Sequence, residues 1–343
     1  MVKSEGYIVD VLTDKALQFI ERNKARPFLC YVPFTTPHSP FSVPPQDWEQ
    51  YKDKPLIQTA VLPKEENPDA TRCVLAMLAN QDRNVGRILA KLKELDLEND
   101  TIVIYFSDNG PNTARWNGNM KGKKGSVDEG GVRSPLFIRW PGKITRGAKV
   151  DAIAGAIDLS PTLHALAQIK RQGDQPLDGS SLVPLLLRGS QTDWPERTLF
   201  QTWGNQVSAR TEKYRLDQAG NLFDMVADPG QTTPIQAKQP ELAQELIASV
   251  AAWRKEMGVA APAGGKGKGK AEPAAPSGEE AWLQQLHKFL VAKPVGLDEF
   301  EPMCRSVDAA IERRRLEREA AKPHGVNRIV CTQHLGAKEH AEY

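Results

Sequence analysis

Residues 101–135, TIVIYFSDNGPNTARWNGNMKGKKGSVDEGGVRSP, decide the fold because they run from an apolar segment directly into a dense polar loop. The first six residues, 101–106, are rich in β-branched and aromatic side chains, which predicts a strand buried on both faces within a parallel sheet. Polar residues then follow the carboxyl end of that strand, where open α/β sheets bind their ligands. The stretch therefore predicts one part of an active site.

The polar residues that follow this strand have the chemistry of a cation site. Asp108 and Asn109 present a carboxylate and an amide oxygen, the hard ligands that Ca²⁺ or Mg²⁺ prefers, and Gly110 frees the backbone to turn. The alternative is a plain turn, because Asp, Asn and Gly favour turns for conformational reasons alone.

A lysine-rich loop follows within the same stretch. Lys121, Lys123 and Lys124 alternate with glycines, and such a loop suits an oxyanion because the backbone can approach the ligand closely. A solvated basic loop that binds nothing is the alternative. The adjacent pair of oxygen ligands favours the binding site.

The preceding segments predict a parallel strand-helix-strand unit. An amphipathic helix is predicted over 7–23 and a buried strand over 28–32, and the proline-rich turn after that strand carries His38. Apolar residues at helical spacing over 69–97 predict a long helix that returns the chain to the strand at 101–106. Such a crossover should be right-handed. His38 would then lie beyond the carboxyl end of a strand, although a single histidine in a loop is mostly incidental when judged by its spacing alone.

Composition excludes several classes of function. The chain has 343 residues and a net charge of +2, which argues against a general attraction to nucleic acid or membrane. It contains no run of roughly 18 apolar residues and no signal peptide, which predicts a cytoplasmic protein for the sequence as written. The four cysteines are scattered, with neither a CxxC pair nor a zinc spacing: Cys30, Cys73, Cys304 and Cys331.

The motifs resemble those of the sulfatase family, the formylglycine-dependent and arylsulfatase-like branch of the alkaline phosphatase superfamily. SDNG followed by GKKGSVDEGGVRSPLFIRWPG carries the resemblance, and FLCYVPFTTPHSPF adds to it. It implies that Asp108 and Asn109 bind Ca²⁺ and that Lys124 and His38 contact the sulfate and serve in catalysis. The expected reaction is Ca²⁺-dependent hydrolysis of a sulfate monoester, small or on a sugar, to alcohol and sulfate.

Other residues of the loop receive lesser roles. Lys121 and Lys123 fall where the family varies, so no catalytic role is assigned to them. Three residues could shape the rim of the site, or pack: Arg115, Trp116 and Asn117. Four residues match the family's EGGxR segment, which is expected to support the loop: Glu129, Gly130, Gly131 and Arg133.

The family's nucleophile motif is missing from the sequence. The resemblance implies a Cys-x-Pro-x-Arg segment whose cysteine becomes formylglycine, and none of the four cysteines fits it. The family's paired aspartates are also missing, whereas calcium takes roughly 6 to 8 oxygens. The expectation is therefore the later half of a sulfatase, truncated or split, inactive alone and exported to the periplasm or secreted if a missing segment carries a signal.

Two alternatives stay open beside this expectation. The chain could be a non-catalytic remnant, or a subunit that pairs with a separate N-terminal half. It could also be a phosphate or phosphonate monoester hydrolase of the same superfamily, although the spacing of SDNG and KKG favours a sulfatase.

The fold class expected is α/β, with a mostly parallel sheet, flanking helices and a small antiparallel C-terminal subdomain. The later part of the catalytic domain is expected over 1–190, and short alternating runs followed by a helix predict the subdomain over 191–257. A Gly-, Pro- and Lys-rich linker is expected over 258–278. A charged helical tail without an assigned role is expected over 279–343.

Overall fold

The computed structural model describes residues 5–260 apart from 172, 174 and 188–193, and all of these belong to one compact unit. The predicted tail lies outside the described residues, as do Cys304, Cys331 and all but the first three residues of the predicted linker.

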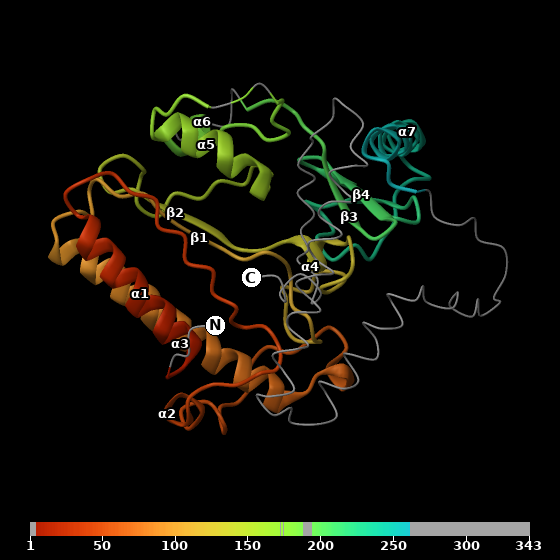
Figure 1. Cartoon of the computed structure of the whole chain (residues 1–343). Coiled ribbons are helices and arrows are strands. Elements are labelled where there is room, and N and C mark those ends of the chain that lie inside the picture. Colours follow the sequence, from red (N-terminus) through yellow and green to blue (C-terminus); the bar gives the residue numbers. More distant parts are fainter. Residues whose placement is uncertain (1–4, 172, 174, 188–193, 261–343) are drawn as a thin grey trace, which may run out of the picture. The chain divides into compact units, whose positions relative to one another are not determined.

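The described residues form helices and short strands in an α/β arrangement (Figure 1). The helices are α1 (Ile8–Asn23), α2 (Pro45–Trp48), α3 (Pro68–Glu94), α4 (Glu129–Val132), α5 (Leu159–Leu166), α6 (Val183–Leu187) and α7 (Pro240–Met257), with 3₁₀ turns η1 (Pro63–Glu65) and η2 (Ala156–Asp158). The strands are β1 (Val103–Phe106), β2 (Leu136–Arg139), β3 (Leu199–Trp203), β4 (Gln206–Arg210), β5 (Tyr214–Leu216) and β6 (Leu222–Asp224). None of the described helices has the length and apolarity needed to cross a bilayer.

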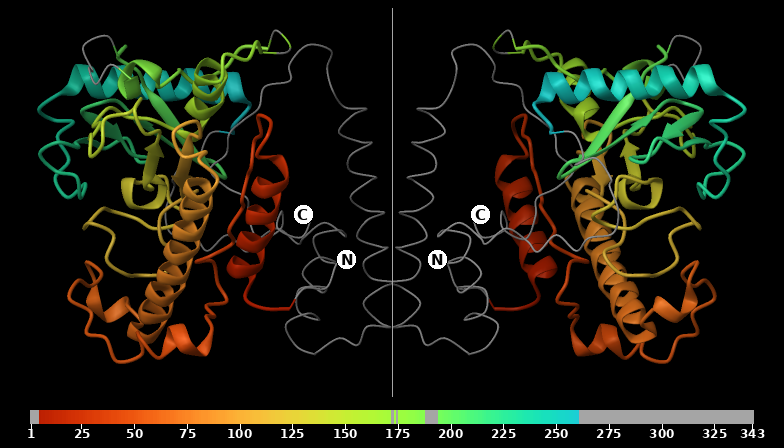
Figure 2. Two further views of the ribbon diagram at one scale, coloured as in Figure 1. Left: turned by 90° about the vertical axis from the view of Figure 1, so that its left-hand side faces the viewer. Right: turned by 90° about the vertical axis from the view of Figure 1, so that its right-hand side faces the viewer.

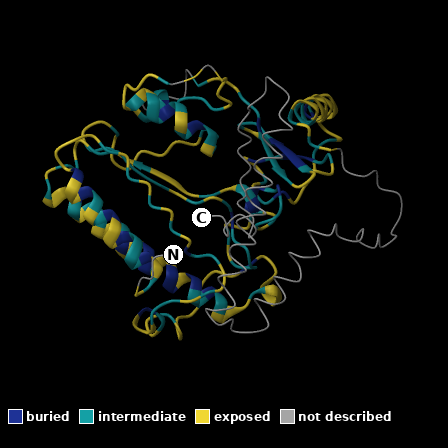
Figure 3. Cartoon of the chain, viewed as in Figure 1, coloured by how far each residue is buried: buried dark blue, intermediate teal, exposed yellow. Residues whose placement is uncertain are grey.

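The two predicted N-terminal helices are confirmed, and they lie side by side (Figures 1 and 2). Helix α3 begins after Asn67, whose side-chain oxygen accepts a hydrogen bond from the backbone N–H of Ala70 at 3.0 Å. Figure 3 shows buried and exposed residues alternating along both helices, as amphipathic packing requires.

Buried polar side chains fasten helix α3 to the segments around it. Asp47 of α2 is 3% exposed and accepts two hydrogen bonds from Arg83, each 2.9 Å long, and one from Asn80. Asn84 donates to Asp10 of α1 at 2.7 Å. The hydrogen bonds from Arg83 lower the pKa of Asp47, so this carboxylate stays ionised in its buried position.

Strand β1 forms as predicted, but its pairing differs from the prediction. It pairs antiparallel with β2, Val103 opposite Arg139 and Phe106 opposite Leu136, and both sheets of the described residues are antiparallel. The parallel strand-helix-strand unit is therefore not formed within the described part of the chain. Burial on both faces is also wrong, since Phe106 is 41% exposed.

The strand predicted over 28–32 is wrong. This segment is extended without strand pairing, and Leu29 and Tyr31 are 79% and 75% exposed. A strand needs a neighbour that takes up its backbone hydrogen bonds, and no described strand pairs with this segment. An apolar run indicates that its side chains favour burial, but it does not provide the neighbouring strand with which to pair.

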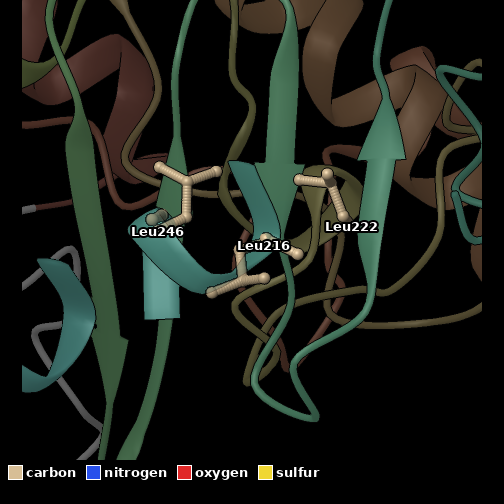
Figure 4. Close-up of a cluster of buried hydrophobic side chains, with 5 residues drawn as sticks. Leu216, Leu222 and Leu246 are labelled. Atoms are coloured by element: carbon tan, nitrogen blue, oxygen red, sulfur yellow. The ribbon is translucent and has the colours of Figure 1, made fainter. Parts of the chain in front are cut away.

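The C-terminal sheet has the strand order β3-β4-β5-β6 and is antiparallel throughout, which confirms the predicted small antiparallel sheet. Helix α7 packs on it, and Leu246 of α7 meets Leu216 and Leu222 of the sheet in a buried cluster (Figure 4). Phe200 and Trp253 stack with ring centroids 5.3 Å apart.

The segment between the two sheets is held by one buried carboxylate. Asp158, fully buried at the start of α5, accepts hydrogen bonds from the backbone N–H groups of Gly155 and Ser180 at 2.8 and 2.7 Å. Arg197 adds two more, of 3.1 and 2.9 Å. This carboxylate thus links the start of α5 to the segment that leads into strand β3.

Candidate functional site

The loop after β1 is built against the residues that precede β2. The hydroxyl of Ser134 donates to the carbonyl of Ser107 at 2.7 Å, and the N–H of Gly110 donates to the carbonyl of Gly131 at 2.9 Å. A Cβ at Gly110 would lie 1.9 Å from the carbonyl oxygen of Gly130. Only glycine permits this approach, which fixes the direction in which the chain leaves the strand.

The lysine loop wraps around the same glycines. A Cβ on Gly131 would lie 2.3 Å from the carbonyl oxygen of Ser126 and 2.7 Å from that of Lys123. The N–H of Lys124 donates to the carbonyl of Pro111 at 2.8 Å, so Lys124 lies beside the Asp-Asn-Gly-Pro segment. The structure thus brings Lys124 to the loop that carries Asp108 and Asn109.

The three lysines of this loop differ in their surroundings. Lys124 is partly buried and Lys123 is exposed. The ammonium of Lys121 lies 3.2 Å from Asp217 and 3.4 Å from Asp128, so it links the loop to the C-terminal sheet. These ion pairs give Lys121 a structural role.

The segment of His38 lies against the same loop. Asn112 is within 3.4 Å of the hydroxyl of Ser39, and the guanidinium of Arg115 lies 5.3 Å from the ring centre of Phe41. His38 is partly buried, and its Nδ1 lies 2.6 Å from the carbonyl oxygen of Ser39, an acceptor, so Nδ1 is the donor. The two segments, about seventy residues apart in the sequence, meet at this point.

The rim residues of the predicted site have different surroundings. Trp116 is 45% exposed. Asn117 donates to the carbonyl oxygens of Met120 and Gly122 at 2.9 and 3.1 Å, so it supports the lysine loop from within.

Asn109 carries an oxygen suited to a cation. Its side-chain nitrogen donates to the carbonyl of Gly110 at 2.6 Å, whereas its Oδ1 is buried and accepts no hydrogen bond from the described residues. A buried acceptor without a donor is costly unless something else binds it. The adjacent carboxylate of Asp108 is exposed. The two oxygens fit part of a Ca²⁺ coordination shell.

The rest of such a shell is not found in the described residues, where no group of three or more His, Cys, Asp or Glu side chains is placed to hold a metal. Calcium takes roughly 6 to 8 oxygens, so the side chains of Asp108 and Asn109 alone do not complete a calcium site.

Formylglycine does not fit this chain. No cysteine is followed by x-Pro-x-Arg. Burial raises the pKa of both Cys30 and Cys73, which disfavours the nucleophilic thiolate.

A buried ion pair holds the lysine loop on the C-terminal sheet. Glu129 is 5% exposed, and its Oε2 lies 2.8 Å from Nη2 of Arg215 and 3.4 Å from Nε of Arg210. Arg215 also donates to the carbonyl of Val127 at 2.8 Å, and the backbone N–H of Glu129 donates to Gln231 at 2.8 Å. The EGGxR segment is thus supported from residues far away in the sequence.

The opposite charges of Glu129 and Arg215 influence each other's pKa. Burial by itself would raise the pKa of Glu129, but Arg215 and Arg210 outweigh it, and the pKa lies below its ordinary value. Burial lowers the pKa of Arg215, and Glu129 opposes that change. Both groups therefore remain charged at neutral pH.

Sequence reasoning assigned Glu129 a supporting role but missed Arg210, Arg215 and Gln231. These residues lie 81 to 102 positions from Glu129, and each stands in a segment whose sequence predicts only a strand or a turn. A central charged residue in a short alternating strand, as in YRL, was the one signal available, because it must find a partner if it faces inward.

Comparison with known proteins decides the family. A family model described as Sulfatase matches residues 2–169, and a second, described as N-sulphoglucosamine sulphohydrolase, C-terminal, matches residues 123–256. The chain belongs to the sulfatase family. The two matches overlap over residues 123–169, a range that includes Lys123, Lys124 and strand β2.

Curated relatives agree with this assignment. The uncharacterized sulfatase YdeN of Escherichia coli (strain K12) is 31% identical over 248 residues, which cover 71% of this chain and 42% of the relative. The N-acetylgalactosamine-6-sulfatase of Canis lupus familiaris is 32% identical over 215 residues, covering 60% of this chain and 37% of the relative. This chain spans about two fifths of the length of these relatives.

Solved structures confirm the α/β fold class. The protein Ps i-CgsB, crystallised in complex with k-i-k-neocarrahexaose, has a TM-score of 0.63 and 25% identity, covering 74% of this chain and 56% of that one. The phosphonate monoester hydrolase of Silicibacter pomeroyi has a TM-score of 0.56 and 21% identity, covering 74% and 60%. At 21% identity, the similarity to the phosphonate monoester hydrolase is a similarity of fold alone.

The Glu129 ion pair yields a prediction about stability. At pH 7, Glu129→Gln should lower the free energy of unfolding by about 3–5 kcal/mol, because Arg215 is left buried without its counter-charge. The folded-state pKa of Glu129 is lowered, so its contribution is present above the unfolded pKa of about 4.3 and disappears as the pH falls through the folded value. The difference between wild type and variant should therefore shrink below about pH 4.

Urea unfolding followed by circular dichroism from pH 3 to 7 measures this effect. The control is Glu94→Gln, whose carboxylate is 62% exposed in a pair with Lys91 and should change stability by less than about 0.5 kcal/mol. A constant difference between wild type and Glu129→Gln across the pH range contradicts the prediction.

Proposed function

We propose that this chain provides the sulfate-binding and cation-binding part of a sulfatase that hydrolyses sulfate monoesters. The observation that carries the proposal is the meeting of three segments: the loop of Asp108 and Asn109, the loop of Lys124 and the segment of His38. A carboxylate, an amide oxygen, an ammonium and an imidazole are the groups that such a reaction needs around the sulfuryl oxygens and the leaving group.

Each residue has a stated part in this mechanism. Lys124 binds a sulfuryl oxygen and neutralises the charge that grows on it during cleavage of the S–O bond. With Nδ1 of His38 donating to Ser39, the imidazolium form of His38 passes its Nε2 proton to the leaving alcohol and becomes the neutral imidazole that keeps its proton on Nδ1. Asp108 and Asn109 would hold a Ca²⁺ ion, which supplies positive charge toward the sulfate when bound.

The nucleophile is the part that these residues do not supply. Since no Cys-x-Pro-x-Arg motif occurs in the sequence, we infer that hydrolysis requires a nucleophile from another polypeptide segment. Exposed apolar residues such as Leu29, Tyr31 and Phe137 support this, because large exposed apolar side chains are typical of a surface that another segment covers.

A second candidate function is that of a non-catalytic or partner-dependent chain that only binds the anion. The missing motif favours it over hydrolysis by this chain alone. A purified chain that hydrolyses an aryl sulfate with Ca²⁺, and loses this activity in Lys124→Ala, contradicts it. Faster hydrolysis of a phosphate or phosphonate monoester under the same conditions would move the assignment to that class.

Sulfate binding should depend on Lys124 and not on its neighbour. Lys124→Ala should weaken the binding of a sugar sulfate about 10- to 100-fold, because it removes one charge-assisted hydrogen bond of about 1.5–3 kcal/mol. The exposed Lys123, changed to Ala, is the matched control and should alter binding less than about twofold. Isothermal titration calorimetry measures both, and equal losses in the two variants contradict the role of Lys124.

Calcium should stabilise the folded chain through Asp108 and Asn109. Because the ion binds only the folded state, a calcium concentration ten times Kd should raise Tm by on the order of 4 °C. Asp108→Asn and Asn109→Leu should each reduce this rise, whereas Asp53→Asn, at an exposed acid elsewhere, should keep it. Thermal unfolding with and without CaCl₂ makes the measurement, and the same rise in all four proteins excludes this site.

A further inference from the structure

Arg115 is a partly buried cation with spare hydrogen-bonding capacity beside the proposed site. It follows the Asp-Asn-Gly-Pro segment by a few residues, and its guanidinium stacks over the ring of Phe41. Its Nη2 donates to two neutral oxygens, those of Thr113 and Asn112. Its Nε is buried and has no hydrogen-bond partner among the described residues.

Arg115 forms no ion pair with a carboxylate of the described residues. Burial lowers its pKa, and among the described residues only the carboxylate of Glu66 acts in the opposite direction. Both oxygens of Glu66 are engaged elsewhere, by the N–H of Ala60 at 2.7 Å and the hydroxyl of Thr71 at 2.8 Å. A guanidinium has five N–H donors and stays protonated, so a buried one without an anion is unusual.

The position of Arg115 connects it with the sulfate site. Asn112, which accepts a hydrogen bond from Arg115, also reaches the hydroxyl of Ser39, next to His38. Arg115 thus stands on the loop that carries the two cation ligands and against the segment that carries the imidazole.

We propose that Arg115 recognises a second anionic group of the substrate, a carboxylate or a further sulfate on the same or the adjacent sugar. The planar guanidinium with its fork of donors matches the oxygens of either anion, which a lysine at that place would bind as a point charge only. This inference rests on the proposed function and narrows its substrate class to sugars with at least two negative groups. A singly charged aryl sulfate would leave Arg115 unused.

The ratio of two affinities tests the inference. The full chain is titrated calorimetrically, in CaCl₂ and about 150 mM NaCl to screen distant charges, with glucosamine 6-sulfate and with glucosamine 2-N,6-O-disulfate. Wild type should bind the disulfated sugar at least tenfold more tightly. Arg115→Gln should bring the ratio close to one, Arg115→Lys should keep part of the preference, and the exposed control Arg146→Gln should keep all of it.

The outcomes separate this inference from the proposed function. Lys124→Ala should weaken both sugars and leave their ratio unchanged, because it acts on the sulfate that both carry. A wild-type ratio near one, or a ratio that survives in Arg115→Gln, overturns the role of Arg115 while Lys124-dependent binding stands. Failure of both sugars to bind overturns the proposed function together with this inference. If Arg115→Gln unfolds, the affinity ratio of the two sugars is measured in Arg115→Lys instead. A ratio equal to that of wild type then overturns recognition of the second anion by the planar guanidinium.

Discussion

The buried ion pair between Glu129 and Arg215 is the interaction on which the arrangement of the site depends. One carboxylate at the start of a four-residue helix receives two hydrogen bonds from an arginine in the middle of the C-terminal sheet. A buried charge left alone would be costly, so the sheet and the loop must stay together. The lysine loop is continuous with Glu129 and cannot move independently of this contact.

Close backbone packing carries the constraint from Glu129 to the polar residues. Gly131 lies under the lysine loop and accepts the N–H of Gly110, so the loop after β1 and the loop of Lys124 share one support. Neither loop has regular secondary structure that would hold it by itself. Their geometry follows from contacts in which a side chain larger than hydrogen would not fit.

Two buried polar atoms near this support lack partners among the described residues: Oδ1 of Asn109 and Nε of Arg115. One is an acceptor and the other a donor. Buried polar groups in folded proteins are nearly always satisfied. A cation can complete the acceptor and an anion the donor, which is the chemistry proposed for Asn109 and Arg115.

The sequence by itself determined the long helices, strand β1, the small antiparallel sheet and the chemistry of the loop. These are local properties: apolar spacing, β-branched runs, and glycines among polar residues. The motifs also carried the resemblance to the family, which the comparisons confirmed. The roles of His38, Lys124, Asp108 and Asn109 remain predictions, although the structure brings their segments together.

Only the tertiary structure decided which segments pair and which buried charges meet. The apolar run at 28–32 has the composition of a strand, yet its conformation depends on a neighbour that its own residues cannot specify. Arg215 reads as one more polar residue of a short strand until Glu129, 86 residues away, is placed beside it. Composition and spacing indicate which secondary structure and which degree of burial a residue favours. Hydrogen bonds and ion pairs also require a partner, and the folded chain sets the position of that partner.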